Sequence, residues 1–129
     1  MGSNTRYSLE PFILSDSIAI TAGTALGTED PSFVLWNPSR DHTSSVVLVR
    51  ITNGATGPTV GLTAQVQFSP DSSGSDWWSL GTTVVGGTAN DEIVERQIPV
   101  GSPYPRFRVI AGGNTGQDVT ILVKGIKVV

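Results

Sequence analysis

The residues of this 129-residue chain that could carry out catalysis are few, and they do not form the pattern of a catalytic site. His42 is the single histidine, and it lies between Asp41 and Ser44 in one short polar segment. A working Ser-His-Asp triad brings its members together from different elements around an oxyanion hole, which neighbouring residues of one loop rarely do. We therefore interpret residues 41–45 as a polar turn.

Two groups of acidic residues could act as paired catalytic acids or as metal ligands. Asp91, Glu92 and Glu95 could supply the two carboxylates of a glycosidase. The alternation over 93–98, however, places Glu95 on the polar side of a strand, facing solvent. The loop 71–76 has oxygen ligands at near-alternate positions around a glycine, as a calcium loop does, but it lacks a distal bidentate Glu. A tight turn is the favoured interpretation of this loop, and calcium binding there stays open. We predict no catalytic residue, no metal site and no cofactor.

Aromatic side chains give the strongest binding signal. Adjacent residues of a strand point to opposite faces, so Trp77 and Trp78 separate if both are in a strand. We expect Trp78 to join Leu80 and Val84 in the core, which leaves Trp77 on the outer face. An outward Trp can stack on a sugar ring, anchor a protein interface or lie flat on a neighbouring strand. All three roles stay open for Trp77.

The composition excludes several classes of partner. The chain has 8 basic and 11 acidic residues and a net charge of −3, whereas a nucleic-acid phosphate backbone requires a basic stripe. It has no cysteine, and therefore no disulfide or thiolate metal site. No apolar run approaches the ~20 residues that span a bilayer. Charged residues make up only 15%, which suits a surface that contacts other protein. We predict neither nucleic acid nor membrane as a partner.

The pattern of apolar residues predicts short strands. Residues 62–68 alternate apolar and polar side chains, as a half-buried antiparallel strand does, and 77–85 would complete a hairpin. Residues 46–51 are apolar at nearly every position, which indicates a strand covered on both faces. Residues 91–98 fit a short helix or a strand, and we predict a strand. The apolar phase shifts at Gly125, which predicts a β-bulge there.

These elements predict the fold class. We expect a single antiparallel β-sandwich or jelly roll of about eight strands. Residues 1–14, with a proline at position 11, are expected to form an extended N-terminal arm. Residues 15–129 would then form the β-sandwich domain, without an internal repeat or an interdomain linker.

Residues 65–81 resemble a pattern of phage-type virion structural proteins: an apolar strand with Gln, a turn with Ser and Asp, a Trp and a closing Leu-Gly. In that family an Arg-x-Arg-Val strand and a Val-rich strand follow, and residues 106–109 and 119–129 are similar to them. The resemblance covers residues 62–129. It implies a capsid decoration, head-fibre or tail-associated protein, commonly a trimer of jelly-roll subunits. No catalytic residue belongs to the pattern.

The expected function is therefore that of a virion structural protein that cements a capsid through many weak contacts and is assembled in the host cytoplasm. Its partners would be copies of itself, most simply in a trimer, and the major capsid or other virion proteins. The alternative is a carbohydrate-binding or receptor-binding module in which Trp77 and Tyr104 stack on sugar rings. We expect two arginines to pair with acidic partners and four aromatic residues to lie at interfaces. The candidate interface residues are Phe12, Trp36, Trp77, Tyr104, Arg106 and Arg108.

Overall fold

The computed structural model describes residues 9–14, 17–25, 34–35, 44–69, 76–79, 81–100 and 106–128. Within these ranges the chain forms strands and connecting turns and contains no helix. Consequently, no helix of the described part is long and apolar enough to cross a membrane.

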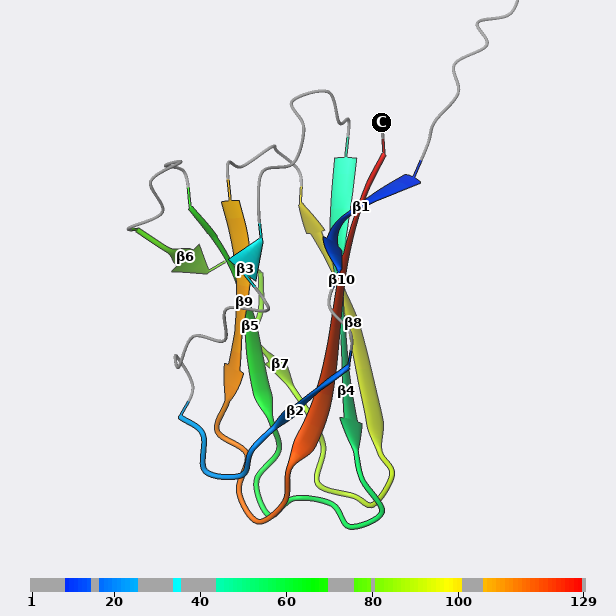
Figure 1. The fold of residues 1–129 in the computed structure, drawn as a ribbon, viewed down its shortest axis with the longest axis vertical. Coiled ribbons are helices and arrows are strands. Elements are labelled where there is room, and N and C mark those ends of the chain that lie inside the picture. Colours follow the sequence, from blue (N-terminus) through cyan, green and yellow to red (C-terminus); the bar gives the residue numbers. More distant parts are fainter. Residues whose placement is uncertain are drawn as a thin grey trace, which may run out of the picture.

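The strands form two antiparallel sheets that pack face to face (Figure 1). We call the first sheet A; it has the order β1-β10-β4-β8, with β2 also paired to β10. Its strands are β1 (Leu9–Leu14), β2 (Ile18–Ile20), β4 (Ser44–Asn53), β8 (Ile93–Val100) and β10 (Val119–Val128). Sheet B has the order β3-β9-β5-β6, with β7 also paired to β5. Its strands are β3 (Val34–Leu35), β5 (Thr63–Ser69), β6 (Trp78–Ser79), β7 (Val84–Val85) and β9 (Arg106–Gly112).

The order of the strands is that of a jelly roll. β1 and β2 both pair with β10, and β6 and β7 both pair with β5, so each couple acts as one interrupted strand. Within the described residues, the ten elements then reduce to eight strands, four in each sheet. In sequence order, the first strand lies beside the eighth and the third beside the sixth in sheet A, and the second lies beside the seventh in sheet B. This confirms the predicted all-β sandwich of jelly-roll type.

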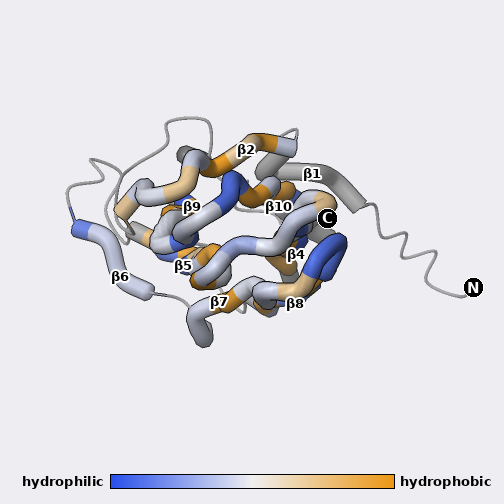
Figure 2. The backbone as a smooth tube through the Cα atoms, turned by 90° about the horizontal axis from the view of Figure 1, so that it is seen from below, coloured by the Kyte–Doolittle hydropathy of each residue, from blue (hydrophilic) through white to orange (hydrophobic). Residues whose placement is uncertain are grey.

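The core fills the space between the two sheets, which Figure 2 shows from one end of the sandwich. Alternate residues of β4, β5, β9 and β10 point inward and are almost completely buried, because period-two alternation sends every second side chain to the same face. The largest fully buried side chains are Ile51, Leu62, Ile121, Val47, Val49, Val66, Val109 and Val119. The opposite face of β4 carries half-buried Val46 and Leu48 and exposed Arg50. The prediction that β4 is covered on both faces is therefore right only for its inner face.

Three local predictions can be compared with the strand pairing. Residues 93–98 form a strand, as predicted, because β8 pairs with β4 over its whole length, whereas Asp91 and Glu92 precede this strand. The N-terminal segment is extended, but β1 is part of sheet A and pairs with β10, so residues 9–14 are not a separate arm; residues 1–8 lie outside the described part. The pairing of β10 with β4 runs unbroken through Gly125, so the predicted bulge in β10 is wrong on that side. The irregularity lies instead in β1, between Pro11 and Ile13.

The exposed edges of the two sheets are short or interrupted. On the β8 edge of sheet A, the carbonyl oxygen of Glu95 accepts a hydrogen bond from Nη1 of Arg96 at 2.8 Å, and Pro99 has no N–H to donate. The β1 edge contains Pro11. In sheet B, the edge strands β3, β6 and β7 are two residues long each. These are the devices by which natural sheets avoid pairing with another chain.

Two buried asparagines hold the turns at one end of the sandwich. Asn53, at the end of β4, donates through Nδ2 to the carbonyl oxygens of Gly87 at 3.1 Å and Ala89 at 2.8 Å. Asn114 donates in the same way to the carbonyl oxygens of Ile20 at 3.1 Å and Gln117 at 2.9 Å. Each side chain therefore ties a turn to the body of the domain through its amide nitrogen.

Candidate functional site

The outer face of sheet B carries a continuous row of polar side chains that ends on an indole ring. Gln65 and Gln67 of β5 point away from the core, and Ser79 and Arg108 lie opposite Gln67 on the neighbouring strands. We call these four residues and Trp77 the Gln–Arg–Trp row. It lies on the side of sheet B that faces away from sheet A.

Each member of the row fixes the next. Nε2 of Gln65 donates to Oγ of Ser79 at 2.6 Å, and Nε2 of Gln67 makes a long hydrogen bond of 3.5 Å to Oε1 of Gln65. Nε of Arg108 donates to Oε1 of Gln67 at 2.7 Å. The Arg108 guanidinium lies over the Trp77 ring, with Cζ 4.3 Å from the ring centroid, which is the geometry of a cation–π contact. The side chains are thus held in one arrangement before any ligand arrives.

The two adjacent tryptophans separate as predicted, but their burial differs from the expectation. Trp78 pairs with Phe68 across β5 and β6, so it shares the inward face, and the two ring centroids are 6.3 Å apart. Trp78 is nevertheless 61% exposed, so the prediction that it belongs to the core is wrong. Trp77 is half-buried under Arg108. The reason is that β6 is a two-residue edge strand, where the inward face is not covered as it is over the centre of the sheet.

The outer face of sheet A has a different surface, a shallow groove of about 400 Å³ that we call the sheet A groove. Two half-buried leucines, Leu48 and Leu122, lie in it among charged side chains. The groove is lined by Leu48, Val49, Arg50, Glu95, Arg96, Gln97, Leu122 and Lys124. It therefore combines apolar area with a basic rim.

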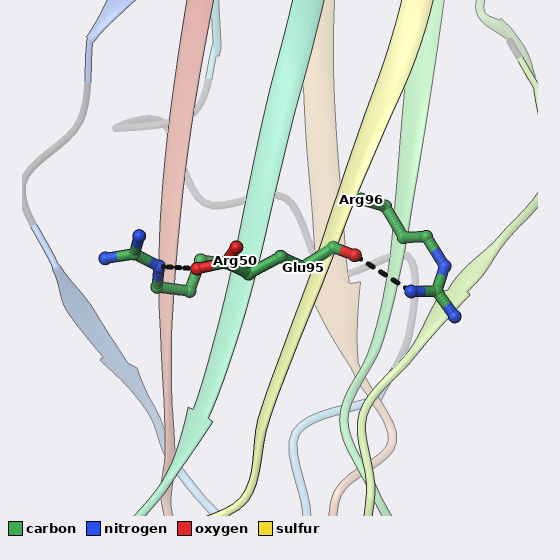
Figure 3. A network of polar contacts seen from close by, with 3 residues as sticks. All are labelled: Arg50, Glu95 and Arg96. Carbon is green, nitrogen blue, oxygen red and sulfur yellow. Dashed lines mark hydrogen bonds and ion pairs between the residues drawn. The ribbon is translucent and has the colours of Figure 1, made fainter.

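An ion pair crosses the sheet A groove from β4 to β8. Nε of Arg50 lies 2.6 Å from Oε1 of Glu95, and Figure 3 shows the two side chains meeting there while Arg96 points to the other side of Glu95. Both side chains of the pair are more than half exposed, at 53% and 59%. Solvent therefore screens their attraction, and the pair shapes the groove more than it stabilises the fold.

Two of the three acidic residues that could have formed a glycosidase pair, Glu92 and Glu95, have partners within the chain. Glu95 is paired with Arg50, on the solvent side of β8 as predicted. Oε1 of Glu92 accepts a hydrogen bond from the backbone nitrogen of Ala89 at 3.1 Å. Asp91 lies in the same turn and adopts a positive φ of 56°. Among the residues that the structure describes, no three His, Cys, Asp or Glu side chains come close enough to hold a metal ion.

Several predicted site residues cannot be placed as side chains. Trp36, Tyr104 and His42 lie outside the described residues, as does the 71–76 loop except for Asp76. Phe12 and Arg106 are described only by their backbone, in β1 and β9. Of the six candidate interface residues, the structure brings Trp77 and Arg108 together. Arg108, expected to pair with an acidic partner, donates to Gln67 within this chain.

Sequence reasoning missed the two glutamines and the two leucines. The alternation of 62–68 already placed Gln65 and Gln67 on the outer face, but a polar outward residue is the ordinary expectation for such a strand. The link from Gln67 to Arg108 spans 41 residues of sequence. It becomes visible only when β9 is known to lie beside β5.

Comparison with known proteins shows no family for this chain. No protein-family model matches the sequence, and no curated protein matches it significantly. No phage family is identified by sequence, so the resemblance of residues 62–129 to virion proteins is supported only as far as the β-sandwich itself.

Solved structures that resemble this chain include a pilus subunit and carbohydrate-binding proteins. A Bacillus endospore appendage protein that forms disulfide-linked pili is 12% identical, with a TM-score of 0.45, over 98% of this chain and 93% of that one. A family 29 carbohydrate-binding module is 11% identical, with a TM-score of 0.47, over 95% and 90%. The N-terminal cellulose-binding domain of a Cellulomonas fimi β-1,4-glucanase is 15% identical, with a TM-score of 0.45, over 88% and 76%. At these identities no site residue is carried over.

Proposed function

We propose that this protein is a carbohydrate-binding β-sandwich module without catalytic activity, and that a neutral glycan lies across the Gln–Arg–Trp row. The observation that carries the proposal is the hydrogen-bonded chain from Ser79 through Gln65 and Gln67 to Arg108 and Trp77. This reading was the alternative expected from the sequence, and the outer face of sheet B supports it better than it supports a capsid contact.

The free hydrogen-bonding capacity of the row suits sugar hydroxyls. A glutamine amide offers two N–H groups and an oxygen with two lone pairs. Gln65 uses one N–H for Ser79 and one lone pair for Gln67, which leaves one donor and one acceptor side by side. A sugar hydroxyl also donates and accepts, so two neighbouring hydroxyls can bond to both positions. Three of the five members of the row, Gln65, Gln67 and Ser79, are uncharged side chains that can donate and accept hydrogen bonds, which suits a neutral ligand.

The internal contacts of the row lower the cost of binding. Ordering a long polar side chain at an interface costs roughly 0.5–1.5 kcal/mol. Gln67 is only 9% exposed and is held from both sides, by Gln65 and by Arg108. A ligand that binds to this face meets side chains that are already ordered, which favours the weak individual contacts of a sugar.

The aromatic contribution differs from the one expected from the sequence. Arg108 covers one face of the Trp77 ring, so Trp77 is held as part of the row. Trp78 is 61% exposed and directly precedes Ser79, at the edge of the sheet. Because Trp78 points to the inward face of the sheet, opposite to the row, a glycan that lies across the row cannot stack on this indole, and we assign no sugar stacking to Trp78.

A matched pair of glutamine variants tests the proposal. Gln65→Leu removes the polar groups from the row, and Gln97→Leu makes the same change in the sheet A groove. Soluble neutral polysaccharides are screened by affinity electrophoresis, and the affinity of each retarding polysaccharide is measured by calorimetry. We expect Gln65→Leu to weaken binding by about tenfold, the equivalent of one or two lost hydrogen bonds. Gln97→Leu should bind like the wild type. Equal losses for both variants, or no retardation of the wild type by any glycan, would contradict the proposal.

The sheet A groove favours a second candidate function, that of a virion structural subunit. Leu48 and Leu122 leave half-buried apolar area on the outer face of β4 and β10. In this function the groove packs either against another copy of the protein in a trimer or against a capsid protein. Each contact is weak, and multivalency makes the total binding to the capsid strong. The capsid would be assembled in the host cytoplasm.

The native mass in solution tests this second candidate. Sedimentation velocity of the wild type should give an oligomer, and Leu48→Ser should reduce it to a monomer. Ile93→Ser is the matched control, because Ile93 is exposed on the same sheet but does not line the groove. A wild-type monomer at all concentrations would remove the support for self-assembly.

A further inference from the structure

Asn53 combines a reactive sequence with an unusual environment. It is the only asparagine of the chain that is followed by a glycine, Gly54. The backbone nitrogen of the next residue can attack an asparagine side-chain amide, and glycine leaves that nitrogen unhindered because it has no Cβ. Asparagine is for such reasons among the thermolabile residues. An Asn-Gly pair in an unfolded chain is therefore prone to deamidation.

In the folded protein, Asn53 is held away from this reaction. Its side chain is 3% exposed, and Nδ2 donates to the carbonyl oxygens of Gly87 and Ala89. The backbone on both sides is also fixed: Asn53 N donates to Glu92 O at 2.9 Å, and Gly54 O accepts from Asp91 N at 2.8 Å. Any rotation of the amide during attack by Gly54 N would break the two Nδ2 hydrogen bonds, so the fold opposes the reaction.

We propose that Asn53 is a modification site that the fold protects, so that unfolding exposes it to deamidation and the deamidated chain no longer folds stably. The proposal is independent of what the protein binds. Each time the protein unfolds in a warm or alkaline solution, Asn53 can deamidate, and a deamidated molecule does not return to the stable fold.

The reaction needs only water as a co-reactant. Gly54 N loses its proton and forms a bond to Cγ of Asn53, and the Cγ–Nδ2 bond then breaks, so that ammonia leaves with a proton from solvent. The product is a five-membered cyclic imide. Water adds to one of its two carbonyl carbons and opens the ring, which gives aspartate or isoaspartate at position 53. The net change is the gain of one water and the loss of one ammonia.

Aspartate cannot replace Asn53 in the fold, because the atom that is lost makes both hydrogen bonds. Nδ2 leaves as ammonia, while the retained Oδ1 is buried without a hydrogen-bond partner among the described residues. In the product an acceptor oxygen would face the carbonyl oxygens of Gly87 and Ala89, in a site that excludes solvent. A buried charge without a partner is strongly unfavourable.

Isoaspartate is no better tolerated. It adds one atom to the main chain at the end of β4, where Asn53 is in register with Val119 of β10. The extra atom would disturb this register and the hydrogen bond from Asn53 N to Glu92 O. Both products therefore break the same connection between β4 and the turn that leads into β8.

The test compares deamidation in the folded and the unfolded chain. The protein is incubated in mildly alkaline buffer with and without urea, digested with trypsin, and the peptide 51–96 is analysed by mass spectrometry. We expect the mass gain of deamidation at Asn53 in urea and almost none without urea. Asn90 lies in the same peptide, is followed by Asp91, and serves as an internal reference. Equal rates of deamidation at Asn53 with and without urea would show that the fold does not protect this residue.

Two variants test the consequence for folding. For Asn53→Asp we expect a folding equilibrium constant lower by about a hundredfold or more, from the cost of a buried charge without a partner, with a lower urea midpoint. Gly54→Ala keeps the asparagine but shields the attacking nitrogen, and an added Cβ there meets no heavy atom of the described residues within 4 Å.

After a long incubation in urea and dilution, Gly54→Ala should refold in higher yield than the wild type, in proportion to the intact Asn53 that remains. An Asn53→Asp protein with the wild-type urea midpoint would refute the proposal. So would equal refolding yields of the wild type and Gly54→Ala after the wild type has deamidated at Asn53.

Discussion

The outer faces of the two sheets are both formed by antiparallel strands, but their side chains are organised differently. On sheet B the polar side chains bond to one another, so that Gln67 is fixed between Gln65 and Arg108. On sheet A the apolar and charged side chains alternate, and an exposed ion pair crosses a groove. One face is ordered in advance and polar, which suits a small hydrogen-bonding ligand. The other is open and partly apolar, which suits a macromolecular surface.

The largest effect should come from the core that both faces share. Leu62 is fully buried between the sheets, and Leu62→Ala should lower the free energy of unfolding by about 2–5 kcal/mol. Urea unfolding followed by circular dichroism measures this change. Because both faces rest on the same core, glycan binding and any self-association should be lost together as the protein unfolds. Loss of one of them at a urea concentration where the other persists would show that the faces are not mechanically coupled.

A smaller effect should separate the two faces. Gln67→Leu takes the acceptor from Arg108 Nε and the donor from Gln65, and it should cost roughly 1–2 kcal/mol of unfolding free energy. Gln97→Leu, on the exposed outer face of β8, should change the same quantity by less than about 0.5 kcal/mol. Parallel urea titrations of the two variants give the comparison directly. Equal destabilisation would mean that the order of the row contributes nothing to stability.

The contact between Arg108 and Trp77 should contribute less. A double-mutant cycle with Arg108→Met and Trp77→Leu should give a coupling energy of about 0.5–1 kcal/mol, the range of a partly exposed cation–π contact. The coupling is obtained from the unfolding free energies of the two single variants, the double variant and the wild type. A coupling near zero would remove Trp77 from the ordered row.

The smallest effect is expected for the ion pair of the sheet A groove. A cycle with Arg50→Ala and Glu95→Ala should give a coupling of roughly 0.2–1 kcal/mol at low salt, because both side chains are more than half exposed. The coupling should shrink in high salt, where the charges are screened. A large coupling that salt does not change would indicate that the groove is as ordered as the row.

Much of the fold can be predicted from the alternation of apolar residues. The strand over 62–68 and its inward side chains follow from the sequence, since Leu62, Ala64 and Val66 are buried as expected. The sequence of segment 91–98 is compatible with a helix or a strand. The pairing of residues 93–98 with β4 shows that they form a strand. Periodicity tells which face a residue occupies, and in the case of Trp78 it does so correctly.

Periodicity does not tell how far a face is covered. Trp78 occupies the inward face but lies on a short edge strand, so it is exposed. The phase shift at Gly125 predicts a bulge in β10, whereas the β10–β4 register is continuous and the irregularity lies in the partner strand β1. The Gln–Arg–Trp row depends on the neighbourhood of β5 and β9, which are far apart in sequence. Local patterns carry no information about such long-range pairing.

The blunted edges of the sheets limit how copies of this protein can join. A subunit can extend a neighbour's sheet only where a row of free N–H and C=O groups meets a straight, unbroken strand. On β8 the Arg96 guanidinium occupies the Glu95 carbonyl and Pro99 withholds a donor, while β1 carries Pro11. Strand-to-strand growth into ribbons or amyloid-like fibrils is therefore disfavoured at both borders of sheet A. We therefore expect copies of this domain to assemble through face-to-face contacts or through their turns, and not through edge-to-edge strand pairing.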